Sequence, residues 1–168
     1  MQKRDELLEV LLDTFGVPVK SSSKCLPIAL CIASDPETPS ELLEHLAKTD
    51  NERLLERIAE HPNLSPFLLE ILASHPSPDV RAAVAENPNV TEDILVALCN
   101  DSHDDVRYRI AENPSMRPEI LANLIEDSNP FVAHRARLTL MKLDEPQGLL
   151  QNIIHMVGAR FVPQRVAR

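Results

Sequence analysis

The motif Asp79-Val80-Arg81-Ala82-Ala83-Val84-Ala85-Glu86-Asn87-Pro88 decides the fold of this chain. It recurs as Asp105-Val106-Arg107-Tyr108-Arg109-Ile110-Ala111-Glu112-Asn113-Pro114. The closing prolines, Pro88 and Pro114, are 26 residues apart, and the same step backward reaches Pro62 and then Pro36. Each of these prolines follows an apolar residue, an alanine and two polar residues. A sequence that repeats itself at such a period is typical of a solenoid.

Composition favours a helical solenoid and disfavours several function classes. Only 3% of the 168 residues are aromatic and none is Trp, so the core must consist of Leu, Ile, Val and Ala, as in packed helices. Three glycines leave little room for a phosphate-binding loop. The formal net charge of −9 repels nucleic acid unless a local basic patch compensates. No apolar run is long enough to span a membrane or to form a signal-peptide core, so we expect a cytoplasmic protein.

The repeat predicts one all-α domain that spans residues 1–168. Residues 1–35 are expected to contain an N-terminal cap, with an amphipathic helix over 1–16, and a half repeat over 25–35. Residues 36–139 contain four repeats of 26 residues, which begin at the four prolines named above. Residues 140–168 are expected to supply a C-terminal capping helix, with Leu149, Ile153 and Ile154 on its apolar side, and a basic tail.

Each repeat is predicted to contain an α-helix followed by a second, shorter helical segment, α or 3-10. In the first repeat, Thr38-Pro39-Ser40-Glu41 predicts a capping box, with the Thr38 hydroxyl as the N-cap. Ala59, Ala85 and Ala111 share one repeat position, where neighbouring backbones are expected to approach closely. The predicted inward positions of the first helices are Leu42, Leu43, Leu46; Leu68, Leu69, Leu72; Ile94, Leu95, Leu98; Ile120, Leu121, Leu124. Those of the second are Leu54, Ile58; Val80, Val84; Val106, Ile110; Val132, Ala136.

These units resemble the leucine-rich repeat variant family. The segments Val80 to Pro88 and Val106 to Pro114 match one half of its unit, and Thr38 to Ala47 matches the other half. The resemblance implies a right-handed α-solenoid, akin to HEAT repeats, in which α-helices alternate with shorter, often 3-10, helices. It implies no shared catalytic activity. A founding member carries an iron–sulfur cluster in a cysteine-rich N-terminal segment, but this chain has only Cys25 and Cys31 there, too few for four-cysteine ligation.

The sequence contains no motif for catalysis, a metal or a cofactor, and we predict none of these. Cys99 occupies the repeat position of Ala47 and Ala73 and is expected to be buried as a small hydrophobe. The six histidines show no metal-binding spacing. Asn87 and Asn113 precede repeat prolines and are expected to hydrogen-bond nearby backbone groups.

The arginines of the second helices are the strongest functional lead. Arg57, Arg109 and Arg135 share one repeat position, and Tyr108 and His134 share the position beside it. We predict that these five residues form one continuous exposed face that binds a partner. Arg81 and Arg107 share another position, where a structural role between repeats is favoured, with Arg107 reaching Asp101 or Asp127.

The sequence therefore predicts a non-enzymatic scaffold that binds a protein, with an acidic segment as the expected ligand. Two alternatives stay open. One is nucleic-acid binding, as in HEAT-like DNA glycosylases for alkylated bases; the other is an adaptor that self-associates through its terminal helices. The row of Glu60, Glu86 and Glu112 leaves a further possibility, an acidic stripe for a basic partner.

Overall fold

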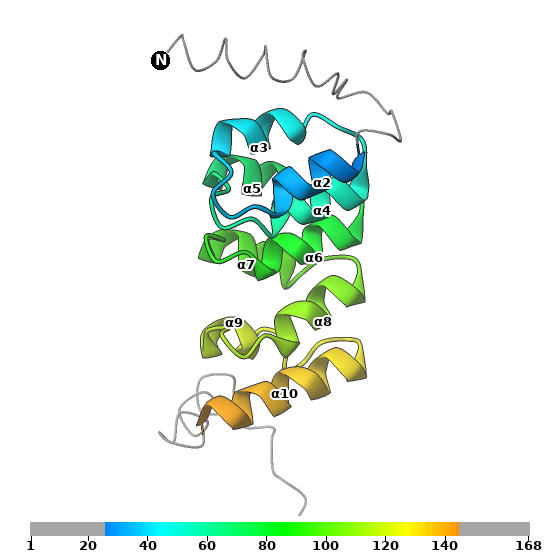
Figure 1. The fold of residues 1–168 in the computed structure, drawn as a ribbon. Helices are drawn as coiled ribbons and strands as arrows, with labels where there is room; N and C mark the ends of the chain where they lie inside the picture. Colours follow the sequence, from blue (N-terminus) through cyan, green and yellow to red (C-terminus); the bar gives the residue numbers. More distant parts are fainter. Residues whose placement is uncertain (1–25, 145–168) are drawn as a thin grey trace, which may run out of the picture. The chain divides into compact units, whose positions relative to one another are not determined.

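The computed structural model describes residues 26–144, and every regular element in this part of the chain is an α-helix (Figure 1). This confirms the predicted helical-repeat fold. The chain divides into two compact units, of which the first ends at Leu98 and the second begins at Cys99. The predicted helices over 1–16 and 149–157, and the basic tail, lie outside the described residues. The right-handed superhelix and the single domain stay predictions.

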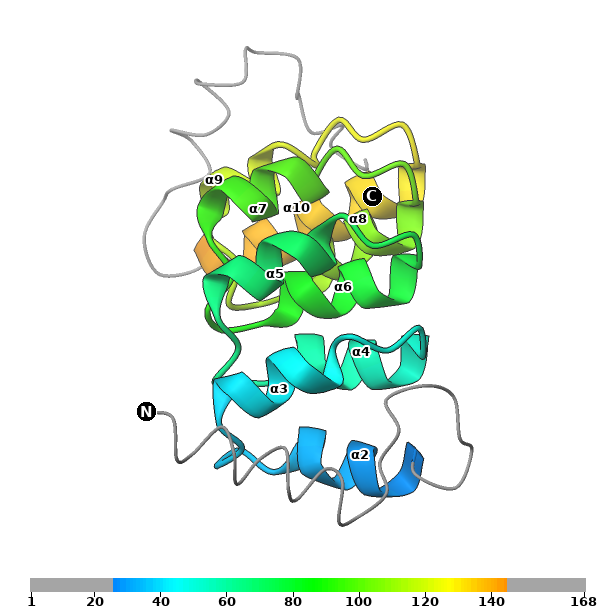
Figure 2. The same cartoon turned by 90° about the horizontal axis from the view of Figure 1, so that it is seen from above.

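Two layers of helices form the first unit. The elements are α2 (Leu26–Ser34), α3 (Ser40–Leu46), α4 (Glu52–Ala59), α5 (Pro66–Ala73), α6 (Pro78–Glu86) and α7 (Glu92–Leu98). The second helices of the repeats, α4 and α6, pack side by side, with α2 on the other side of α4, and α3, α5 and α7 make the other layer (Figures 1 and 2).

The second unit repeats this arrangement with fewer helices. It contains α8 (Asp104–Glu112), α9 (Pro118–Ala122) and α10 (Pro130–Asp144). The second helices α8 and α10 pack against each other, and α9 packs against α10 (Figure 1).

The core lies where the repeat predicts it. All the predicted inward side chains are buried except Leu42, which is half-buried. Ala59, Ala85 and Ala111 are also buried, as predicted. Because each buried Leu, Ile or Val side chain contributes about 1.5–3 kcal/mol relative to exposure, the regular set of apolar positions is the main source of stability.

The second helix of each repeat is not the shorter one, and this part of the prediction was wrong. α4, α6 and α8 have 8, 9 and 9 residues, whereas α3, α5 and α7 have 7, 8 and 7. The last repeat pairs the 5-residue α9 with the 15-residue α10. The second helix runs until the repeat proline forces its preceding residue out of the α region, as at Asn87 with ψ 133°.

The capping box predicted at Thr38 is also wrong. Helix α3 begins at Ser40 after Pro39, whose side chain offers no acceptor. The Thr38 hydroxyl instead donates a hydrogen bond to the Ile32 carbonyl of α2 at 2.6 Å. Thr38 is buried, and its hydroxyl therefore satisfies a carbonyl at the end of the preceding helix. Ser65 does cap its helix, accepting from the amide of Leu68.

Polar side chains at one repeat position, that of His61, Asn87 and Thr139, connect a repeat to the previous one. The Asn87 amide donates to the carbonyls of Ala59 and His61 at 2.6 and 2.9 Å. Its Oδ1 accepts from the Asn89 amide at 2.8 Å, so the buried side chain is satisfied on both sides. The structural role predicted for Asn87 is confirmed, and its side chain bonds to the backbone of the preceding repeat as well as to its own turn.

The same position makes the same kind of bond elsewhere. His61 is buried, and its Nε2 lies 2.7 Å from the Asp35 carbonyl while its Nδ1 accepts from the Asn63 amide. In the second unit, the Thr139 hydroxyl donates to the Ala111 carbonyl at 2.7 Å. Asn63 adds an outer bond from its side chain to the Pro36 carbonyl at 2.8 Å. These bonds fix how each of these repeats is placed against the previous one.

We expect Asn87→Ala to lower the free energy of unfolding by about 2–3 kcal/mol, because it leaves two buried carbonyls without their donor. Asn63→Ala removes an exposed bond of the same type and should cost less than about 1 kcal/mol. Urea denaturation followed by circular dichroism gives both values. Equal losses for the two variants would contradict the role assigned to the buried bond.

Candidate functional site

The predicted partner-binding residues lie on second helices, on the side away from the core. Arg57 on α4 and Arg109 on α8 are exposed, and Arg135 on α10 is half-exposed. His134 is exposed, and Tyr108 is half-buried. The side chains are therefore open to solvent to different degrees.

In the first unit, Arg57 borders a hollow between α2 and α4. Its Nη1 donates to Glu60 Oε2 at 2.8 Å across one helical turn. The hollow has a volume of about 280 Å³ and is lined by Leu30, Ser34, Arg53, Glu56, Arg57 and Glu60. Two arginines and two glutamates thus face the same small space.

In the second unit, two arginines share one carboxylate. Arg109 Nη1 lies 3.7 Å from Glu112 Oε1, and Arg135 Nη2 lies 3.9 Å from Glu112 Oε2. Among the described residues, the Nε of Arg135 is buried without a hydrogen-bond partner. Both contacts with Glu112 are longer than the 2.8 Å pair of Arg57 and Glu60.

A continuous row of arginines stays a prediction. Arg57 belongs to the first unit, whereas Arg109 and Arg135 belong to the second. On α6 the equivalent position is Ala83, which is buried, so this helix adds no arginine to the row. What the structure brings together is the pair Arg109 and Arg135 around Glu112.

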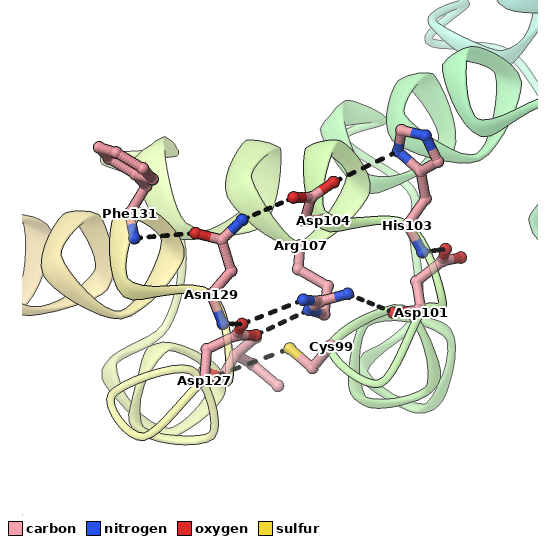
Figure 3. Close-up of polar contacts among 9 residues, drawn as sticks. Cys99, Asp101, His103, Asp104, Arg107, Asp127, Asn129 and Phe131 are labelled. Atoms are coloured by element: carbon pink, nitrogen blue, oxygen red, sulfur yellow. Dashed lines mark hydrogen bonds and ion pairs between the residues drawn. The ribbon is translucent and has the colours of Figure 1, made fainter.

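Arg107 has the structural role that the sequence favoured. Its Nε and Nη2 donate to the two carboxylate oxygens of Asp127 at 2.7 and 3.0 Å, and its Nη1 donates to the Asp101 carbonyl at 2.7 Å (Figure 3). The side chains of Arg107 and Asp127 are 11% and 6% exposed, so this is a largely buried bidentate pair. Arg81 donates to the carbonyls of His75 and Pro76 in the turn before its own helix.

Hydrogen bonding, burial and charge shift the pKa values of Arg107, Asp127 and Cys99, and that of Arg107 is raised by its hydrogen bonds with Asp127. The hydrogen bonds from Arg107 lower the pKa of the Asp127 carboxyl below its usual value of 3.8. The neighbouring thiol of Cys99 is buried, as predicted, and its burial, with the Asp127 charge, raises its pKa to about 11. Cys99 is therefore a neutral packing residue at pH 7. Cys31 is exposed.

A group that could hold a metal ion lies at the start of α8. One ligand atom each of His103, Asp104 and Asp105 falls within 4.8 Å of the others, and all three residues are exposed. Asp104 also accepts from the Asn129 side chain at 2.6 Å (Figure 3). Acidic residues at a helix N-terminus are stabilised by the helix dipole, so the cluster is explained without an ion.

Residues 29–88 match the family model of the Leucine Rich Repeat Variant domain. This confirms the resemblance over about a third of the chain, and it covers the first repeats and the hollow beside Arg57. No curated protein and no solved structure matches the chain. Within residues 26–144, none of the helices is long and apolar enough to cross a membrane.

An apolar group on the open side of α10 was not predicted from the sequence. Phe131, Leu138 and Met141 are 75%, 37% and 45% exposed. The sequence did contain a signal, since apolar residues replace charged ones at two outward repeat positions. Phe131 stands where the earlier repeats have Arg53, Asp79 and Asp105. Leu138 stands where they have Glu60, Glu86 and Glu112. Comparing outward positions between repeats would have found it.

We expect Asp127→Asn to lower the free energy of unfolding by about 3 kcal/mol at pH 7, because it leaves the buried guanidinium of Arg107 without its counter-ion. Since folding lowers the pKa of Asp127, its contribution is complete above the unfolded pKa of about 3.8 and is lost as pH falls through the folded pKa. The difference in the free energy of unfolding between wild type and variant should therefore shrink below about pH 4.

Glu119→Gln serves as the control. It removes an exposed contact with Arg117 and should change the free energy of unfolding by less than about 0.5 kcal/mol. Urea titrations across the pH range measure this, and a gap that is constant down to the acid limit would contradict the pairing.

We further expect the Cys99 thiol to resist modification in the folded protein, because burial raises its pKa and blocks access. A Cys25→Ser/Cys31→Ser variant isolates it. Treatment with a chromogenic disulfide reagent at pH 7 should give no fast reaction in buffer and one equivalent of reaction in denaturant. Rapid reaction in buffer would show that the helix ends around Cys99 open readily.

Proposed function

We propose that this protein is a non-enzymatic helical-repeat scaffold of the cytoplasm that binds an acidic segment of another protein. The exposed sides of the second helices are the proposed surface, with Arg57, Tyr108, Arg109, His134 and Arg135 as contacts. The observation that carries the proposal is that two arginines of neighbouring second helices, Arg109 and Arg135, come together around Glu112, at 3.7 and 3.9 Å from its carboxylate oxygens.

The geometry of these contacts favours exchange with a partner. Exposed ion pairs contribute little to stability, typically less than about 1 kcal/mol, so breaking one requires little free energy. A carboxylate from a partner can replace Glu112 opposite Arg109 or Arg135 and make a shorter, bidentate contact. The proposal therefore requires only side-chain movement.

The hollow beside Arg57 supports a second contact of the same kind. Arg53 and Arg57 both border it, and its volume of about 280 Å³ admits a carboxylate side chain. Arg53 is exposed, so its guanidinium can turn toward a ligand. We place one acidic residue of the partner there.

Nucleic-acid binding is less well supported. Each of the proposed arginines lies beside a glutamate, Arg57 next to Glu60 and the other two next to Glu112. These carboxylates and the net charge of −9 oppose a long phosphate backbone more than a short acidic segment, whose few charges can meet the arginines alone. A gel shift at low salt separates this alternative from protein binding.

Two matched variants test the proposed surface. Arg57→Gln/Arg109→Gln/Arg135→Gln removes the cations, whereas Glu60→Gln/Glu112→Gln removes the carboxylates that compete with a partner. We expect the first variant to lose capture of an acidic protein and the second to strengthen it, because the same guanidinium groups are removed or released. Quantitative pull-down at two salt concentrations measures both effects.

Circular dichroism and thermal melting serve as controls for folding. Both variants should keep the helical content, since exposed substitutions usually change stability little. Capture that is equally strong with the arginine variant would place the interface elsewhere. Unfolding of that variant would show that these arginines belong to the scaffold and would overturn the proposal.

A further inference from the structure

The hollow of the first unit has a mainly charged lining. Helices α2 and α4, which contribute its walls, pack side by side (Figures 1 and 2). Its volume of about 280 Å³ is just below the usual range of ligand pockets, so it fits one or two side chains better than a large ligand. Helix α4 lines it with Arg53, Glu56, Arg57 and Glu60, and α2 lines it with Leu30 and Ser34.

Half of these polar groups already have partners within the hollow. Arg57 Nη1 donates to Glu60 Oε2 at 2.8 Å, so these two charges neutralise each other. The Ser34 hydroxyl donates to the Leu30 carbonyl at 2.8 Å, one turn back on α2. The side chains that are left to meet a ligand are therefore Arg53 and Glu56.

Arg53 and Glu56 lie three residues apart on α4, a spacing at which helical side chains are neighbours. Within residues 26–144, however, neither side chain makes a hydrogen bond or an ion pair. Arg53 is exposed and Glu56 is half-buried, so a ligand in the hollow can reach both. The hollow thus offers one guanidinium and one carboxylate, close together and on the same helix.

The stacking of the repeats does not require this pair of charges. Helix α6 packs against α4, and α10 packs against α8, although none of the other three second helices has a cation and an acid at these two positions. The equivalents of Arg53 and Glu56 are Asp79 and Ala82 on α6, Asp105 and Tyr108 on α8, and Phe131 and His134 on α10. The pair is therefore a feature of this hollow rather than of the repeat.

We propose that the hollow between α2 and α4 binds a dipolar pair of side chains from the partner protein, an Asp or Glu beside a Lys or Arg. The acidic side chain pairs with the Arg53 guanidinium, whose planar fork suits a carboxylate. The basic side chain pairs with the Glu56 carboxylate and lays its methylene stem on the half-buried Leu30. This inference rests on the proposed scaffold function, which places an acidic residue in the hollow, and adds the cation beside it.

A free amino acid carries the same chemistry, because its carboxylate and ammonium groups are also close together. Such a molecule loses its translational and rotational freedom when it binds, and a small open hollow returns few contacts. A segment of a partner that is also held elsewhere loses less freedom when it enters the hollow. The partner segment is therefore the favoured ligand.

Titrations of the full-length chain, followed by the chemical shifts of its amides in NMR spectra, test the proposal. The probes are capped dipeptides without terminal charges: acetyl-Glu-Lys-amide, acetyl-Glu-Gln-amide and acetyl-Gln-Lys-amide. We expect the first to shift amides of α2 and α4 saturably and the other two to bind about fivefold more weakly, since each lacks one ion pair. Equal binding of acetyl-Glu-Gln-amide, or no saturable shift in α2 and α4 with any probe, would overturn the proposal.

Single substitutions separate the two charges. Arg53→Gln and Glu56→Gln should each weaken binding of acetyl-Glu-Lys-amide about fivefold, because each removes one half of the dipole. Glu70→Gln is the matched control, since Glu70 is exposed on α5 and lies outside the hollow. It should leave binding unchanged. Stronger binding by Glu56→Gln would show that Glu56 competes with the ligand for Arg53 and would overturn the proposal.

The remaining outcomes separate this inference from the proposed function. Binding that depends on Arg53 but not on Glu56 would keep an acidic contact in the hollow, as the proposed function has it, and would overturn the dipolar ligand. Saturable binding of free glutamine without binding of acetyl-Glu-Lys-amide would assign the hollow to a free amino acid and would also overturn the inference. The pull-down with the arginine variant measures capture of an acidic protein, whereas the dipeptides report on the hollow alone, so the two ideas fail separately.

Discussion

The structure depends on a hydrogen bond from the side chain at one repeat position, that of His61, Asn87 and Thr139, to the main chain of the preceding repeat. Asn87 donates to the Ala59 carbonyl, and Thr139, two repeats further along, donates to the Ala111 carbonyl. The accepting residue is a buried alanine in both cases, which allows the backbones to approach closely. Because a buried carbonyl without a donor is costly, this bond fixes the step between repeats more sharply than apolar packing alone.

The constant step leaves the outward positions free to differ. The core positions keep Leu, Ile, Val or Ala in every repeat, whereas one outward position holds Arg53, Asp79, Asp105 and Phe131 in turn. A change at such a position alters the surface without disturbing the stack, so binding properties can vary while the fold stays the same. The exposed side of α4 carries mixed charges, whereas that of α10 carries apolar residues.

Neighbouring arginines illustrate how position decides role. Arg107 and Arg109 are two residues apart on α8, and two residues correspond to more than half a turn of a helix. Arg107 is therefore directed into a largely buried bidentate pair with Asp127, while Arg109 faces solvent and makes a 3.7 Å contact with Glu112. The first stabilises the second unit, whereas the second belongs to the proposed binding surface.

The sequence by itself determined the helical repeat, its period and its core, because these follow from local spacing that recurs every 26 residues. It also identified Arg107 as structural and Cys99 as buried. Only the tertiary structure decided that Thr38 bonds to α2 instead of capping α3, that Arg109 and Arg135 share Glu112, and that Phe131, Leu138 and Met141 are open to solvent. The physical reason is that a side chain's hydrogen-bond partner and its exposure depend on which helices pack around it in space, and local sequence patterns do not specify that packing.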